Sequence, residues 1–262
     1  MNKFFGYILT PLYYLFFWFW LGIFHPIQWL AYNIGGYRAH KFIVDIMNCC
    51  LVATCYLLGN RVTFTNPQNL PVNRPIIFIA NHQSMYDIPP IIWFLRKHHA
   101  KFISKIELTK GIPSISYNLR KGGGANIDRK DSKQSIMEIV HLAERMKDRN
   151  WSAVIFPEGT RAKDGKLKSF QVGGVATILK KCPNALIVPL AIDNSWRMVQ
   201  YGFFPLSALE HITLKVLTPI EPGTTPIEEI VMQAHDDIQR ALGSRSPTLS
   251  GREGLIKLAA SK

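Results

Sequence analysis

The sequence predicts an α/β protein with a single mixed or mostly parallel sheet flanked by helices, preceded by an N-terminal hydrophobic helical hairpin. From Arg61 onward, short runs of strand composition alternate with segments of helical periodicity, which is typical of such a sheet. Before that point, no formally charged residue occurs between Lys3 and Arg38. With 47% apolar residues among 262, the chain can bury the core of one large domain.

The N-terminal segment, residues 1–60, is expected to be a membrane anchor. Phe4 to Phe24 is apolar almost throughout, and roughly 20 such residues in a helix match the hydrocarbon core of a bilayer. Pro11 interrupts this run, and its many aromatic residues favour the headgroup interface. A second apolar run, Ile46 to Leu58, is too short to span comfortably and follows the basic turn Tyr37 to Lys41. We therefore favour a hairpin or interfacial anchor over one true span, and over a cleaved signal peptide.

Residues 61–243 form the predicted α/β domain, and residues 244–262 form a loosely held tail. A surface helix is expected to begin with Asp131 as N-cap and Gln134 as N3. Another helix is expected to begin near Asp87, where Pro89 and Pro90 are tolerated because they fall in its first turn. The expected strands are 61–65, 75–80, 151–156, 185–192 and 211–217, and the expected helices are 87–99, 131–149, 170–181 and 225–243.

The formal charge of +13 indicates an anionic partner, which could be a phosphate-bearing substrate, an acidic membrane surface or a nucleic acid. No helix-turn-helix, zinc or aromatic RNA-binding pattern is present in the sequence, so we do not expect nucleic acid to be the partner. The four cysteines show neither metal-ligand spacing nor a disulfide framework, so we expect no metal site.

The apolar run 76–80 ends in Asn81-His82, and Asp87 follows five places after the histidine. α/β proteins expose functional groups where a strand gives way to a loop at the carboxyl edge of the sheet. A neutral imidazole there can accept a hydroxyl proton, and a carboxylate in the next helix can hold its other ring nitrogen. Ser84 is best placed to cap that helix. The alternative is a capping or core histidine beside an aspartate that merely favours a first turn.

Two further segments place polar groups near strand ends. In VIFPEGTR (154–161), Gly159 lets the backbone approach a ligand, Arg161 offers a fork of donors that suits a phosphate, and Glu158 can orient the arginine or a substrate hydroxyl. The alternative is a surface turn with an ion pair. The segment RKGGGANIDRK (120–130) combines glycines with cations and predicts an anion site, with a solvated basic face as its alternative.

Four blocks, NHQSMYD, a glycine-led segment ending in IDR, FPEGTR and VPLAI, occur in the order of the sequence blocks of the glycerolipid acyltransferases. The chain resembles the lysophosphatidic acid acyltransferase (1-acylglycerol-3-phosphate O-acyltransferase) family over about residues 61–220, including the phrase KFISKIEL at 101–108. The H-x4-D and FPEGTR blocks are specific when they occur together. In the second block, Ala125 and Asn126 stand where the family commonly has a bulky or aromatic residue, which bears on the choice of acceptor.

The resemblance implies a role for each matching residue. His82 would be the general base that removes the proton from the acceptor's free hydroxyl, and Asp87 would orient it and balance its charge. The hydroxyl would then attack an acyl thioester without an acyl-enzyme. Arg161 and Arg129 would hold the acceptor's phosphate. The phosphate site would be shaped by Glu158, Gly159 and Thr160. In the fourth block, Val188 and Pro189 would lie near the bound substrate.

The implied activity is transfer of a fatty acyl group from acyl-CoA or acyl carrier protein to 1-acylglycerol 3-phosphate, giving phosphatidic acid, with no further cofactor. Because the acceptor and product are lipids while the donor is soluble, the anchor would hold the enzyme at a membrane with its catalytic domain on the cytoplasmic face. The alternative is a related acyltransferase whose acceptor is glycerol 3-phosphate, another lysophospholipid or a lyso-aminolipid.

Overall fold

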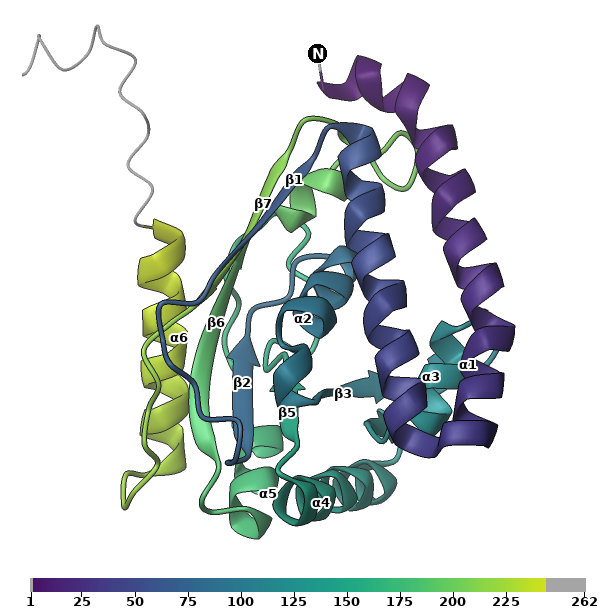
Figure 1. The fold of residues 1–262 in the computed structure, drawn as a ribbon. Helices are drawn as coiled ribbons and strands as arrows, with labels where there is room; N and C mark the ends of the chain where they lie inside the picture. The colour runs from purple at the N-terminus through teal and green to yellow at the C-terminus, as the bar shows by residue number, and fades with distance from the viewer. Residues whose placement is uncertain (1, 244–262) are drawn as a thin grey trace, which may run out of the picture.

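The computed structural model describes residues 2–243, so the expected tail at 244–262 lies outside the described residues. Seven strands form one sheet in the order β1-β7-β6-β2-β5-β3-β4, with helices on both faces (Figure 1). All neighbouring strands run parallel except β6 and β7. The predicted fold class, a single mixed sheet flanked by helices, is confirmed.

Five strands lie where the sequence predicts them, and two have no counterpart in the prediction. The five are β1 (Arg61–Thr65), β2 (Ile76–Ala80), β5 (Ser152–Ile155), β6 (Leu186–Asp193) and β7 (His211–Val216). The other two, β3 (Ala100–Lys105) and β4 (Ala125–Ile127), form one edge of the sheet. Their sequences, AKFISK and ANI, lack a continuous apolar run, so neither matches the pattern of a buried strand.

The helices divide between the two faces of the sheet. Ile76, Phe78 and Ala80 of β2 pack in the cluster that contains α1 and α2, while the alternate residues of β2 pack with α4, α5 and α6. Asp131 accepts a hydrogen bond from the Gln134 amide at 2.9 Å, which confirms it as an N-cap. The helices are α2 (Ile88–Phe94), α3 (Ile115–Lys121), α4 (Ser132–Arg149), α5 (Gly173–Lys181) and α6 (Ile227–Gly243).

Helix α1 (Asn2–Thr54) is bent into a hairpin at Gly36, where φ is 62° and ψ is −153° (Figure 1). The predicted hairpin is present, but the predicted turn at residues 37–41 is wrong. Those residues are helical, and Lys41 forms an ion pair with Asp45 one turn later. Glycine adopts positive φ without the steric strain of a Cβ, which places the bend at Gly36. Pro11 lies inside the helix without breaking it.

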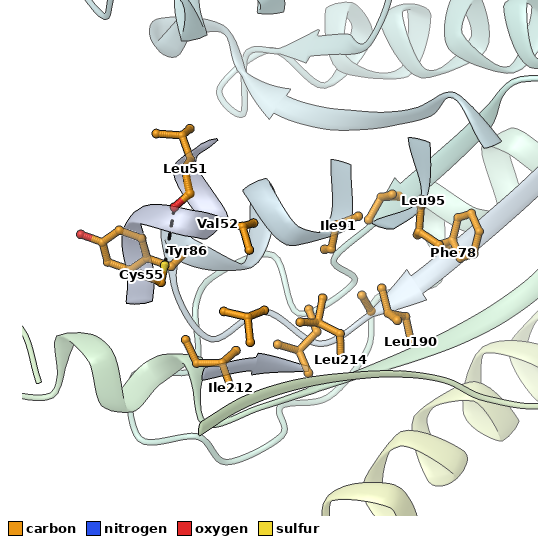
Figure 2. Close-up of a cluster of buried hydrophobic side chains, with 14 of the residues drawn as sticks. Leu51, Val52, Cys55, Phe78, Tyr86, Ile91, Leu95, Leu190, Ile212 and Leu214 are labelled. Carbon is orange, nitrogen blue, oxygen red and sulfur yellow. Dashed lines mark hydrogen bonds between the residues drawn. The ribbon is translucent and has the colours of Figure 1, made fainter. Parts of the chain in front are cut away.

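The second half of α1 is part of the core of the α/β domain. Figure 2 shows its last turns packed against α2 and against side chains of the sheet, in a cluster that includes Leu51, Val52, Cys55, Ile91, Leu95, Leu190, Ile212 and Leu214. The N-terminal segment and the sheet therefore share one hydrophobic cluster. The division of the chain at residue 60 stays a prediction.

Candidate active site

The candidate site lies at the edge of the sheet where the parallel strands β2 and β5 end. Ile79 of β2 pairs in register with Ile155 of β5, so the loops that follow the two strands emerge side by side. Asn81 holds the end of β2 to β6, because its side-chain amide donates to the Ile192 carbonyl at 2.8 Å and its oxygen accepts from the Ile192 amide at 2.8 Å. The residue that follows, His82, therefore starts from a fixed backbone.

The predicted pair, His82 and Asp87, is in contact. The Nδ1 atom of His82 lies 2.8 Å from Oδ2 of Asp87. The imidazole stacks on the ring of Phe156 with centroids 4.1 Å apart, and 15% of the histidine side chain is exposed. With Nδ1–H directed at the carboxylate, Nε2 remains as the proton-accepting nitrogen.

Asp87 is fully buried and held by hydrogen bonds on both oxygens. Its Oδ2 also accepts the backbone amides of Gln83 at 2.8 Å and Ser84 at 3.0 Å. The Ser84 hydroxyl accepts the Tyr86 amide, which confirms Ser84 as the predicted N-cap, here of the 3-10 turn η2 (Met85–Asp87) that precedes α2. Asp87 therefore has both of the roles that the sequence allows. It completes the capping box of this turn, and it also contacts His82.

Glu158 joins the loop after β5 to the loop after β2. Its Oε1 accepts the His82 backbone amide at 2.8 Å, and the Ala162 amide donates to the His82 carbonyl at 2.7 Å. Burial raises the pKa of the Glu158 carboxyl above its usual range, although the bond from His82 opposes that rise. The carboxylate thus fixes the backbone of the histidine. Sequence reasoning places Glu158 in the phosphate site and does not foresee this contact.

The same loop carries the predicted phosphate-binding residues. Gly159 has φ of 69°, and Lys168 donates to the Thr160 hydroxyl at 3.0 Å and to the Arg161 carbonyl at 2.8 Å. Arg161 is exposed, and its guanidinium forms no hydrogen bond or ion pair with any residue of 2–243. The loop therefore presents a free guanidinium to solvent beside the histidine strand.

Arg129 and the fourth-block residues lie farther from the histidine. Arg129 is exposed just after β4, at the same edge of the sheet but three strands from β2, or about 14 Å by strand spacing. Lys105 ends β3 between them and is exposed, and it is the basic residue of this edge that sequence reasoning misses. Val188 and Pro189 are buried in the middle of β6, opposite Phe78 and Ile79, and belong to the interior of the sheet.

A second missed residue is Ser195, which follows β6 and is fully buried. Its hydroxyl donates to Oδ1 of Asp87, the oxygen that does not face the histidine. No local sequence pattern predicts this contact, because the two residues are 108 positions apart.

Across residues 2–243 there is no group of three or more His, Cys, Asp and Glu side chains placed to hold a metal ion.

The arrangement is suited to general-base chemistry on an anionic substrate. A partly exposed imidazole is oriented by a buried carboxylate, and the exposed cations Arg161, Lys105 and Arg129 line the same edge of the sheet. Such a base can take a proton from a hydroxyl while cations hold a nearby phosphate.

The chain is similar in sequence to known acyltransferases. The family model described as "Acyltransferase" matches residues 61–193. A 1-acyl-sn-glycerol-3-phosphate acyltransferase of Cocos nucifera is 30% identical over 179 residues, which are 67% of this chain and 54% of that protein. The enzyme of the same name from Helicobacter pylori is 33% identical over 162 residues, 59% of this chain and 64% of its own. The chain thus spans between half and two thirds of the length of these relatives.

The fold has a counterpart among solved structures. The crystal structure of the 1-acyl-sn-glycerophosphate (LPA) acyltransferase PlsC from Thermotoga maritima matches with a TM-score of 0.76 at 23% identity, over 92% of this chain and 96% of that one. This likeness extends over the N-terminal helix as well as the sheet, and at this identity it describes the fold. Because the family model covers the strands and loops that carry His82, Asp87 and Glu158, the chain belongs to the acyltransferase family.

Proposed function

We propose that this protein transfers a fatty acyl group from a thioester, acyl-CoA or acyl carrier protein, to the free hydroxyl of 1-acylglycerol 3-phosphate and so forms phosphatidic acid. The observation that carries the proposal is the contact of 2.8 Å between His82 Nδ1 and Asp87 Oδ2 at a sheet edge that also presents the free guanidinium of Arg161. The names of the relatives and the order of the sequence blocks support the same acceptor.

In the proposed reaction, Nε2 of His82 takes the proton of the acceptor hydroxyl as the oxygen attacks the thioester carbonyl. The new C–O bond forms a tetrahedral intermediate, which collapses as the C–S bond breaks. The proton then passes from His82 to the leaving thiolate, so the histidine returns to its starting state. Asp87 balances the charge of the imidazolium, and Phe156 and Asp87 hold the ring in the orientation that presents Nε2.

Arg161 is proposed to bind the acceptor's phosphate. Its planar fork can form two parallel charge-assisted hydrogen bonds, and Gly159 and Thr160 give the loop its shape. Arg129 follows β4, three strands away from β2, at the same carboxyl end of the strands. A glycerol phosphate with its acyl chain could contact both arginines only if it lies along this end of the sheet.

We propose that α1 attaches the protein to a membrane with the catalytic domain on the cytoplasmic face. Within the described residues, α1 and its continuation to Leu58 are long and apolar enough to cross a bilayer, although 56% of the most apolar window is buried. Burial on one side and exposure on the other suit a helix that lies in the interface. Its exposed apolar side chains include Phe4, Ile8, Leu15, Trp18, Trp29 and Ile34.

The loop at residues 201–205 extends this apolar surface onto the α/β domain. The Phe204 ring meets the Tyr7 ring of α1 edge-on at 5.7 Å, and the Tyr14 hydroxyl donates to the Phe203 carbonyl at 2.7 Å. Phe203 is 60% exposed and Phe204 56% exposed. Both rings are therefore placed to enter the same lipid surface as α1.

Vesicle partitioning tests the membrane surface. Replacing Phe203 and Phe204 by Ser should weaken partitioning into vesicles of phosphatidylcholine and phosphatidylglycerol by about a hundredfold, since two exposed apolar rings no longer enter the lipid. The control is Met232→Ser, on the exposed face of α6. Equal partitioning of the two variants would contradict the assignment of the loop to the lipid surface.

An acceptor panel tests the activity. Purified protein is assayed with acyl-CoA and with acyl carrier protein against 1-acylglycerol 3-phosphate, glycerol 3-phosphate, other lysophospholipids and a lyso-aminolipid. We expect the highest kcat/KM with 1-acylglycerol 3-phosphate. A higher kcat/KM with a lyso-lipid that lacks a terminal phosphate monoester would contradict the assignment of the acceptor.

A further inference from the structure

Ser195 approaches the active site from the turn after β6, the strand that neighbours β2 on the side opposite β5. β6 ends at Asp193, and Asn194 adopts a left-handed conformation with φ of 65°, which reverses the chain into the 3-10 turn η5 (Ser195–Val199). The Asn194 side chain donates to the His211 carbonyl at 3.0 Å and so ties this reversal to β7. Ser195 is therefore brought against the loop that carries His82 and Asp87 by a fixed turn.

The two oxygens of Asp87 have different partners. Oδ2 accepts from His82 Nδ1 and from the amides of Gln83 and Ser84, all of which belong to its own loop. Oδ1 accepts from the Ser195 hydroxyl, the one donor that reaches it from residues 2–243. Because Asp87 is fully buried, Oδ1 would have no replacement partner from solvent if this hydroxyl were lost.

Gln83 fixes Ser195 in turn. Its Oε1 accepts the Ser195 backbone amide at 3.1 Å, while its own backbone amide donates to Asp87. All three residues have at most 1% of their surface exposed. Gln83, Asp87 and Ser195 therefore form a buried hydrogen-bonded network between the loop after β2 and the turn after β6, in which only the Gln83 Nε2 atom has no partner among residues 2–243.

We propose that Ser195 is a positioning residue for acyl transfer, which acts through Asp87 and not on the substrate. By holding Oδ1, it keeps the carboxylate plane in the orientation that directs Oδ2 at His82 Nδ1. It also spreads the negative charge of Asp87 over two hydrogen-bonded oxygens, so that the carboxylate stays in place when His82 gains and loses a proton. This inference rests on the proposed function, since it assigns Ser195 to the same histidine.

The test compares Ser195→Ala with Ser207→Ala in the full chain. Ser207 is a matched control, because it is also fully buried, follows β6 and donates to a carboxylate, Oε1 of Glu210, at 2.7 Å. We expect Ser195→Ala to lower kcat by about tenfold with less than a twofold change in acceptor KM, as for loss of a group that orients the base. Ser207→Ala should leave kcat unchanged.

A double-mutant cycle with Asp87→Asn separates positioning from stability. If Ser195 acts through Asp87, Ser195→Ala should lower kcat in the native background and change it by less than twofold in the Asp87→Asn background. Ser195→Cys, which keeps a weak donor of similar size, should give an intermediate kcat and provides a second variant if the alanine protein does not fold.

The outcomes separate the two proposals. Equal fractional losses of kcat in both backgrounds, or native kcat in Ser195→Cys and Ser195→Ala, would overturn the positioning role while the activity of the native enzyme upheld the proposed function. Absence of acyl transfer by the native enzyme with every acceptor would instead overturn the proposed function itself.

Discussion

Replacing the buried Lys101 should change the free energy of unfolding, by an amount set by the residues around its ammonium group. It lies on β3 with 6% of its surface exposed, and its Nζ sits 4.6 Å from the ring centroid of Trp151 and 4.7 Å from that of Tyr37. Burial, together with the neighbouring charge of Lys41 and against the opposing effect of Asp45, lowers the pKa of the Lys101 ammonium from 10.5 to about 7. Replacing Lys101 by Met removes this charge and keeps the apolar stem.

The sign of the effect follows from linkage. The unfolded chain binds the Lys101 proton more tightly than the folded chain does. The charged lysine therefore lowers the free energy of unfolding in full below pH 7, and this penalty fades as the pH rises from 7 towards 10.5. At pH 7 the drop in pKa corresponds to about 4 kcal/mol. Loss of two cation–π contacts offsets about half of this. Lys101→Met should therefore raise the free energy of unfolding by about 2 kcal/mol at pH 7.

Thermal and urea unfolding in detergent at pH 7 and pH 10.5 measure this difference. A gain of about 2 kcal/mol should raise Tm by about 4–8 °C for a chain of this length. The penalty falls by about 1.4 kcal/mol per pH unit above pH 7, so the gain should be close to zero at pH 10.5, where much of the lysine is neutral in the unfolded chain as well. The control is Lys110→Met, on an exposed residue, which should change stability by less than about 0.5 kcal/mol. A Lys101→Met protein that is less stable than native at pH 7, with the same gap at pH 10.5, would refute the reasoning.

Three further predictions concern the loop after β5 and helix α1. Arg161→Ala should raise the acceptor KM by about tenfold or more with a smaller change in donor KM, and Arg161→Lys should restore it in part; equal changes for both substrates would exclude the phosphate role. Gly159→Ala should lower stability by about 1 kcal/mol in urea unfolding, because φ is 69° there. Deleting residues 1–60 should weaken membrane binding and cause aggregation by exposing the shared core, so a monomeric truncation that binds lipid as tightly as the full chain in flotation and size-exclusion assays would contradict the packing.

The interior of the sheet is predictable from the sequence, and the edge formed by β3 and β4 is not. β2, β5 and β6 are buried on both faces and read as apolar runs, so their positions follow from composition. β3 carries Lys101 at a buried position, where two aromatic rings accommodate it, and therefore resembles a loop in sequence. β4 has three residues, too few to show any period.

The bend of the N-terminal hairpin shows a similar limit. Its existence follows from two apolar runs, but the sequence prediction places the turn in the basic stretch Tyr37 to Lys41. That stretch is helical because its charges are accommodated within the helix and against the domain, as when Lys41 donates to the Arg96 carbonyl at 3.1 Å. Gly36, the residue that can adopt positive φ, is the actual bend.

For the site, the sequence predicts the contact between His82 and Asp87 because both belong to one short loop and their spacing is local. The roles of Glu158 and Ser195 as partners of that loop depend on contacts across 76 and 108 positions, which only the register of β2 with β5 and β6 creates. The sequence predicts Arg161 and Arg129 as partners of one phosphate, but their separation depends on the two strands between β2 and β4.

The central claim is that His82 is the general base, and turnover measured together with unfolding on one preparation of His82→Ala tests it most directly. Removing a general base typically lowers the rate by about 10²–10⁴-fold, so kcat should fall by that factor while Tm and vesicle binding stay near native values, because the side chain is partly exposed. Asp87→Asn should also lower kcat, since an amide does not balance the imidazolium charge. Near-native turnover by folded His82→Ala, or a lowered Tm with unchanged specific activity, would contradict the account.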